Sequence, residues 1–102
     1  MHLETLRVYR DVVRLRSFSR GAELNFVTQS AASQAIQQLE GSLGVPLIDR
    51  TKRPFVVTPE GEAFYQSAQA ILAAWDKARA DVAAVKVRVE GTVGGGANYL
   101  VG

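Results

Sequence analysis

The sequence predicts a mainly α-helical protein in which three helices and a two-stranded β-hairpin precede one long helix. Along most of the chain, apolar residues recur at three- and four-residue steps, the period of an amphipathic helix. Two short β-prone runs interrupt that period once, around a proline-containing break, as expected of a hairpin. The length of 102 residues and the hydrophobic content of 47% suit one small globular fold.

The composition argues against an enzyme and against a metal or cofactor site. There is no cysteine, which excludes disulfides, thiolate metal ligands and a cysteine nucleophile. The only histidine is His2, beside the terminus, where we expect it to be solvated. Glu60 and Glu62 are two residues apart on a predicted helix, so their side chains point in different directions. No apolar run is long enough to span a membrane, and residues 1–16 are too charged for a signal peptide, so we expect a cytoplasmic protein.

Two amphipathic helices are predicted at the start of the chain, over about residues 3–16 and 20–25. Ser19 precedes the second and can cap it. Gly21 and Ala22 are small enough to let a neighbouring helix approach closely. The apolar stripe of the first helix is Leu3, Leu6, Tyr9 and Val13.

A third helix follows a turn at Phe26 and Val27, with Thr28 as its expected cap. Gly44 suits a left-handed stop at its end, and Pro46 prevents its resumption. The apolar stripe of this helix is Ala32, Ile36, Leu39 and Leu43. Its other face is polar and consists of Thr28, Gln29, Ser30, Ser33, Gln34 and Gln37.

The hairpin is predicted from residues 47–50 and 55–57, which flank a polar break. Its tip carries Lys52 and Arg53, and Arg50 lies near its base. Basic residues outnumber acidic ones over residues 1–57, whereas the two types nearly balance over residues 58–102. Positive charge is therefore concentrated in the part of the chain that contains the hairpin.

The fourth helix is predicted to start at Thr58 and Pro59 and to reach about Arg88. Its apolar positions alternate by four and three residues, a heptad pattern, and thirty helical residues span roughly 45 Å. Because so small a fold cannot cover such a helix, we expect a partner helix from a second copy, although Ile71 and Trp75 packing on the first helix is the alternative. The positions are Phe64, Ala68, Ile71, Trp75, Ala78, Val82, Val85 and Val89.

These elements favour DNA binding. A helix fits the major groove, and the glutamine and serine side chains of the third helix can hydrogen-bond base edges. Lys52 and Arg53 can reach backbone phosphates or the minor groove, and Arg20 can add a phosphate contact. The alternative is that the polar face is merely solvated and that the chain is a helical protein-interaction module without DNA binding.

An ordered set of short motifs closely resembles the N-terminal region of LysR-type transcriptional regulators over about residues 3–90. The resemblance implies a winged helix-turn-helix over residues 1–58, a linker helix over 59–90 through which two chains dimerise, and a hinge at 91–102 that begins an absent effector domain. It further implies promoter DNA as the partner in a bacterial cytoplasm, a tetramer for a full-length parent, and no small-molecule ligand in this fragment. The motifs are Ser17-Phe18-Ser19-Arg20, Ala22, Leu24, Thr28-Gln29-Ser30-Ala31-Ala32-Ser33, Ile36, Leu39-Glu40, Leu43-Gly44-Val45-Pro46-Leu47, Arg50 and Thr58-Pro59-Glu60-Gly61.

Position by position, the resemblance implies base contacts from Thr28, Gln29, Ser30, Ser33 and Gln34. It implies that Arg53 approaches the minor groove and that Arg50 is partly structural, with a possible phosphate contact. Three residues depart from the family pattern. Gln34 replaces a frequent Arg or Lys, Gly21 replaces a frequent Ala and should loosen the second helix, and Ile48 replaces a frequent Phe.

Overall fold

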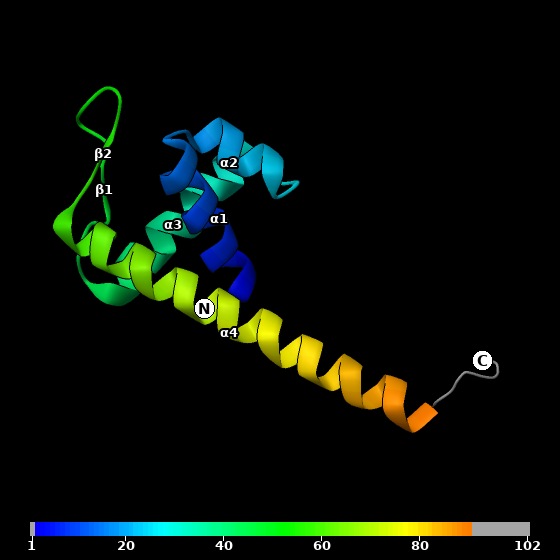
Figure 1. The fold of residues 1–102 in the computed structure, drawn as a ribbon. Coiled ribbons are helices and arrows are strands. Elements are labelled where there is room, and N and C mark those ends of the chain that lie inside the picture. The colour runs from blue at the N-terminus through cyan, green and yellow to red at the C-terminus, as the bar shows by residue number, and fades with distance from the viewer. Residues whose placement is uncertain (1, 91–102) are drawn as a thin grey trace. The chain divides into compact units, whose positions relative to one another are not determined.

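A computed structural model describes residues 2–90, which divide into two units, one up to Leu72 and one from Ala73 onward. The element order is three helices, a two-stranded hairpin and one long helix, which confirms the predicted fold class. Figure 1 shows α1, α2 and α3 gathered together with the hairpin extending beside them. The first unit includes the beginning of the long helix and so extends to Leu72, beyond the boundary expected at residue 58. The expected hinge at 91–102 lies outside the described residues.

Helices α1 (Leu3–Leu15) and α2 (Phe18–Leu24) are separated by a tight connection. Arg16 ends α1 in the left-handed conformation, with φ of 53°. The Ser17 hydroxyl oxygen accepts the Arg20 backbone N–H at 3.1 Å, and Ser17 is therefore the cap of α2. The prediction that Ser19 is this cap was wrong, because α2 starts two residues earlier than expected.

Gly21 makes the close helix contact that its size predicts. A Cβ atom at this position would lie 2.5 Å from Val12 Cγ2 and 2.7 Å from the Val12 backbone nitrogen. The backbones of α1 and α2 approach so closely there that a methyl group requires a shift. Gly21 therefore serves tight packing of α2 on α1, which differs from the loosening expected of a glycine in this helix.

Helix α3 (Gln29–Leu43) begins and ends where the sequence predicts. The Thr28 hydroxyl oxygen accepts the Ala31 N–H at 3.0 Å, and Gly44 is left-handed with φ of 74°. Three residues of the predicted stripe are buried, whereas Leu43 is exposed. The buried ones, Ala32, Ile36 and Leu39, join Tyr9, Val12 and Leu47 in the main core.

The hairpin has two short antiparallel strands, β1 (Ile48–Asp49) and β2 (Val56–Val57), with Ile48 opposite Val57. Both strands are shorter than predicted. The Asp49 carboxylate accepts the backbone N–H of Thr51 at 3.0 Å and also its hydroxyl, which starts the turn directly after β1. The Arg53–Pro54 peptide bond in the loop is cis.

Helix α4 (Pro59–Glu90) is a single long helix that ends slightly beyond the predicted Arg88. The Thr58 hydroxyl oxygen caps it by accepting the Gly61 N–H at 2.9 Å. A Cβ at Gly61 would overlap the Leu47 carbonyl oxygen, and the buried Tyr9 hydroxyl donates to the Gly61 carbonyl at 2.7 Å. The first turn of α4 is therefore held firmly against α1 and the base of the hairpin.

The beginning of α4 contributes to the core of the first unit. Ala68 is fully buried and Leu72 almost so, both beside Leu6 of α1. The half-buried Phe64 packs edge-on against Tyr9, with ring centroids 5.4 Å apart. The assignment of Ala68 to a dimer interface was therefore wrong, and Phe64 is likewise committed to its own core. The heptad pattern led to this error because the same spacing describes both the core face and the exposed face of α4.

Candidate nucleic-acid interface

The start of α2, the first turns of α3 and the hairpin tip line one open groove of about 530 Å³. It brings Gln29 and Ser33 together with Lys52, Arg53 and Arg50. The groove therefore combines neutral hydrogen-bonding groups with positive charge. Its lining is Arg16, Ser17, Phe18, Ser19, Gln29, Ser33, Arg50, Lys52, Arg53, Pro54 and Phe55.

The polar face of α3 points away from the core because Ala32, Ile36 and Leu39 occupy the opposite face. Gln29 and Ser33, one helical turn apart, line the groove. The remaining predicted base contacts lie on α3 or at its cap, are exposed, and do not line the groove. These residues are Thr28, Ser30 and Gln34.

Positive charge on this side of the molecule is accessible. Lys52 and Arg53 are exposed at the hairpin tip and form no ion pair with another described residue. Arg20 is exposed in the first turn of α2, outside the lining of the groove. Lys52, Arg53 and Arg20 can therefore bind a polyanion without first breaking an ion pair to a carboxylate among the described residues.

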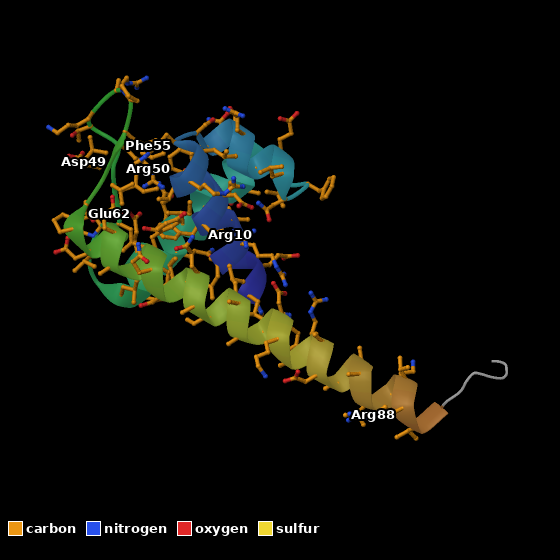
Figure 2. The ribbon with its side chains drawn as sticks, in the orientation of Figure 1. Arg10, Asp49, Arg50, Phe55, Glu62 and Arg88 are labelled. Atoms are coloured by element: carbon orange, nitrogen blue, oxygen red, sulfur yellow. The ribbon has the colours of Figure 1, made fainter. Side chains whose placement is uncertain are left out.

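Arg50 is held differently from the other predicted backbone contacts. Its Nη1 donates to Glu40 Oε1 at 3.2 Å, and its guanidinium carbon lies 5.0 Å from the centroid of the Phe18 ring. Phe18 in turn packs edge-on against Phe55, with centroids 5.2 Å apart. Figure 2 labels Arg50 and Phe55, which lie between the hairpin and the helices. Arg50 therefore helps to attach the hairpin to α3, through Glu40, and to α2, through Phe18.

Sequence reasoning missed Arg16, Ser17 and Ser19 as parts of this surface. Arg16 is exposed, lines the groove, and lies 3.8 Å from Glu62 across a solvent-exposed ion pair. The available signal was its position directly before a Ser-Phe-Ser sequence. The sequence predicts Arg16 at the end of the first helix and Ser19 at a helix cap, and gives neither a place on the DNA surface.

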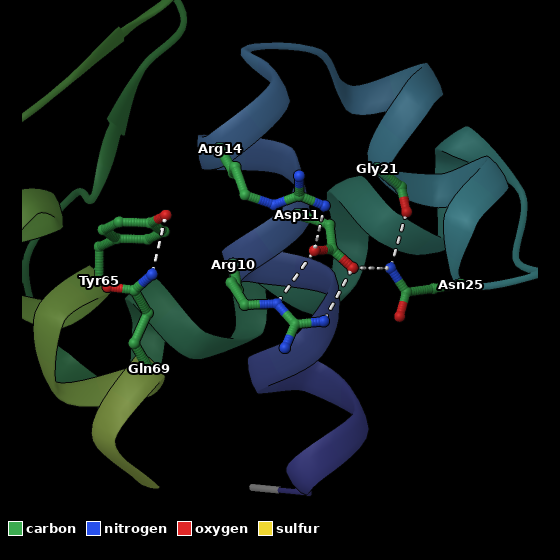
Figure 3. Close-up of polar contacts among 7 residues, drawn as sticks. All are labelled: Arg10, Asp11, Arg14, Gly21, Asn25, Tyr65 and Gln69. Carbon is green, nitrogen blue, oxygen red and sulfur yellow. Dashed lines mark hydrogen bonds and ion pairs between the residues drawn. The ribbon is translucent and has the colours of Figure 1, made fainter. Parts of the chain in front are cut away.

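A buried carboxylate also went unrecognised in the sequence. Asp11 on α1 is 3% exposed and accepts hydrogen bonds from Arg10 Nε at 3.0 Å, Arg14 Nη2 at 3.2 Å and Asn25 Nδ2 at 2.9 Å (Figure 3). Burial alone raises the pKa of Asp11, but the hydrogen bonds from Arg10, Asn25 and Arg14 together outweigh burial and lower it. Asn25 also donates to the Gly21 carbonyl, so the cluster fixes the end of α2 on α1 just before the turn into α3.

The second unit is described from Ala73 to Glu90 and exposes apolar side chains along α4. Trp75 is 42% exposed and Val82 69% exposed. Trp75, Ala78 and Val82 line a shallow apolar groove. Two exposed ion pairs, Lys77–Asp81 at 2.7 Å and Arg79–Asp76 at 3.0 Å, are further contacts along this helix.

Residues 2–90 contain neither a membrane-spanning helix nor a cluster of metal-ligating side chains. No helix in that range is both long and apolar enough to cross a membrane. The same range contains no cluster of three or more histidine, aspartate or glutamate side chains that could hold a metal ion.

A family model described as "Bacterial regulatory helix-turn-helix protein, lysR family" matches residues 3–62. The HTH-type transcriptional regulator HdfR of Escherichia coli O139:H28 is 37% identical over 98 residues, which cover 96% of this chain and 35% of HdfR. This chain therefore spans about a third of the length of that relative.

Solved structures give the same result. The BenM DNA-binding domain in complex with benA site 1 DNA aligns with a TM-score of 0.80 and 36% identity, over 84% of this chain and 97% of that one. DarR of Vibrio fischeri in complex with DNA aligns with a TM-score of 0.79 and 28% identity, over 84% of this chain and 30% of DarR. The chain belongs to the LysR family of bacterial regulatory helix-turn-helix proteins.

Proposed function

We propose that this chain, a LysR-type helix-turn-helix DNA-binding module, binds promoter DNA sequence-specifically as a dimer, with α3 in the major groove and the hairpin near the minor groove. One observation carries the proposal: Gln29 and Ser33 share a groove with Lys52 and Arg53. The related HdfR is named a transcriptional regulator, and the BenM and DarR structures contain DNA. A module that binds only protein does not require this combination of side chains.

The exposed face of α3 is suited to base edges. A glutamine can form two hydrogen bonds with adenine, and serine or threonine hydroxyls can donate to or accept from several bases. We expect Gln29 and Ser33 to contribute most, because they face the groove. Ser30 and Gln34 are expected to contact neighbouring bases, and Thr28 lies at the opening turn.

The hairpin tip is suited to the DNA backbone. Lys52 and Arg53 are exposed and unpaired among the described residues, so DNA phosphates can pair with them at little intramolecular cost. Contacts of this type set orientation and add affinity that depends strongly on salt. Arg20 is expected to make a phosphate contact on the α2 side.

We propose that dimerisation uses the exposed apolar side chains of α4, and that a second copy of this chain covers them. A contiguous apolar strip on a helix marks an interaction surface, and a heptad spacing suits another helix. Phe64 and Ala68 are excluded from the proposed interface because they pack in their own core. The proposed interface residues are Ile71, Trp75, Ala78, Val82 and Val85.

The longer relatives lead to a proposal about the parent protein. This chain matches 35% of HdfR, and we propose that the rest of such a protein carries an effector domain that binds a small inducer. The chain itself is proposed to have no inducer response and no catalytic activity, and to act at the nucleoid in a bacterial cytoplasm. A tetramer is proposed for the parent only.

The test is the salt dependence of DNA binding for Arg53→Ala. We expect weaker binding to the duplex most enriched from a random pool, and a log–log salt slope lower by about 0.9 for one lost phosphate contact. Lys77→Ala is the matched control, since it removes one positive charge from α4 and should leave the slope unchanged. A chain that forms dimers but binds no DNA at low salt would instead support the protein-interaction alternative.

A further inference from the structure

Glu40, near the end of α3, holds the root of the hairpin. Its side chain is only 12% exposed. Its Oε2 atom accepts the backbone N–H of Leu47 at 2.8 Å and that of Ile48 at 3.1 Å. One carboxylate oxygen therefore connects α3 directly to the first residues of the hairpin.

The second oxygen of Glu40 extends this connection across the hairpin. Oε1 accepts from Arg50 just after β1, and the Arg50 guanidinium stacks over Phe18 of α2. Phe18 packs against Phe55, which directly precedes β2. The contacts thus link α3, both strands of the hairpin and α2 in one series.

Two of the three guanidinium nitrogens of Arg50 are buried, so they are poorly accessible to a phosphate. Its Nη1 is engaged by Glu40, and its Nε and Nη2 atoms are buried without an acceptor among residues 2–90. The aromatic face of Phe18 stabilises the Arg50 cation together with the Glu40 carboxylate. Lys52 and Arg53, by contrast, are exposed.

We propose that Glu40 and Arg50 are positioning residues, which hold the hairpin tip beside α3 so that Arg53 reaches DNA while α3 reads bases. The proposal rests on the proposed function. A partly buried ion pair with further hydrogen bonds adds little net stability but restricts geometry, because its partners tolerate few alternative arrangements. A tip carried by two-residue strands depends on such an anchor.

The direction in which DNA affinity changes on removal of the Glu40 charge separates a positioning role from simple charge repulsion. Glu40 is a negative charge close to the proposed DNA surface, so its removal should strengthen DNA binding by simple electrostatics. If the carboxylate positions the hairpin, its removal weakens binding. Glu40→Gln is suitable because the amide oxygen can still accept the Leu47 and Ile48 N–H groups, whereas the charged partner of Arg50 is lost.

The experiment measures affinity for the selected duplex over a range of salt concentrations. We expect Glu40→Gln to bind more weakly, with a log–log salt slope lower by about 0.9, as for Arg53→Ala. The double variant Glu40→Gln/Arg53→Ala should have a salt slope no lower than that of either single variant. Glu23→Gln is the matched control, because it neutralises an exposed glutamate of α2 and should bind equally or slightly more tightly. Equal or tighter binding by Glu40→Gln would overturn the proposal.

A second variant decides the question if Glu40→Gln does not fold by circular dichroism. Arg50→Met keeps an aliphatic stem over Phe18 and removes the charge. Positioning predicts that Arg50→Met and Arg53→Ala together lower the slope no more than Arg53→Ala alone. A direct phosphate contact predicts additive losses approaching two units, which would contradict the proposal.

The wild-type chain offers a further measurement that needs no substitution. Solvent exchange of the Arg50 Nε proton should be slow in the free protein and unchanged on DNA, since this atom is buried. Exchange of the Arg50 Nε proton that becomes slow only after DNA is added would overturn the proposal. Absence of DNA binding by the wild-type chain would instead refute the proposed function, which keeps the two failures distinguishable.

Discussion

Replacing Asp11 with Asn should destabilise the fold well away from the proposed DNA surface. The carboxylate is almost fully buried and is the acceptor for Arg10, Arg14 and Asn25. An asparagine presents an NH2 group and a single acceptor oxygen at this place. In either orientation of that amide, its NH2 group faces a donor of Arg10 together with a donor of Arg14 or of Asn25.

The expected loss in the free energy of unfolding depends on how exposed each hydrogen-bond partner of Asp11 is. The hydrogen bond from Asn25 to a buried charge contributes about 1.5–3 kcal/mol. Arg10 and Arg14 are one-third to one-half exposed, so each of their ion pairs contributes less than about 1 kcal/mol. The expected loss is about 3 kcal/mol in the free energy of unfolding, or a Tm lower by about 12–24 °C.

The stability difference between wild type and Asp11→Asn should also depend on pH in a defined way. The folded-state pKa of Asp11 lies below its ordinary value of 3.8, so its stabilisation is fully present above that value. It is lost as the pH falls through the lower, folded-state pKa. The difference between wild type and Asp11→Asn should therefore be constant near neutral pH and should narrow below about pH 4.

Thermal unfolding by circular dichroism at fixed protein concentration measures the difference from pH 7 to pH 3. Asp81→Asn is the control, because its pair with Lys77 is exposed and should change stability by less than about 0.5 kcal/mol. A loss of stability from Asp11→Asn no larger than that of the control would show that the buried carboxylate does not stabilise the fold. A stability difference between wild type and Asp11→Asn that stays constant down to pH 3 would show that the ionised Asp11 carboxylate is not its source.

Three further predictions concern the base contacts, the dimer and the attachment of α4. Gln29→Ala should cost roughly 1–3 kcal/mol at one base-pair position, and repeating the duplex selection checks it; an unchanged site would exclude Gln29 as a reader. Trp75→Glu should place a charge in the proposed interface and give monomers by light scattering, whereas persistent dimers would locate the interface elsewhere. Tyr9→Phe should lower stability by about 1 kcal/mol in thermal unfolding, since the buried hydroxyl no longer donates to Gly61; an unchanged Tm would show that this bond contributes nothing.

Local signals in the sequence were sufficient for most of the fold. Thr28, Gly44 and Thr58 occupy the caps expected from their chemistry, because a cap depends on a few neighbouring residues only. The start of α2 was misplaced because Ser17 and Ser19 are both good caps. Which of them serves depends on how α1 ends, at the left-handed Arg16.

Contacts between distant residues were beyond such signals. Periodicity placed Ala68 on an apolar face but could not say whether that face meets its own chain or another. Arg50 was recognised as partly structural through the family resemblance, whereas its stacking on Phe18 and its pairing with Glu40 depend on the folded arrangement. The Asp11 cluster likewise joins residues of two helices that no sequence spacing connects.

Selection of bound duplexes from a random-sequence DNA pool, at moderate salt with the 102-residue chain, tests whether this protein binds DNA sequence-specifically as a dimer. We expect enrichment of an interrupted palindrome, because the spacing of half-sites mirrors the two-fold symmetry of a protein dimer. A single enriched half-site would keep base reading by α3 and contradict dimerisation through α4. No enrichment, with the fold intact by circular dichroism, would contradict sequence-specific DNA binding itself.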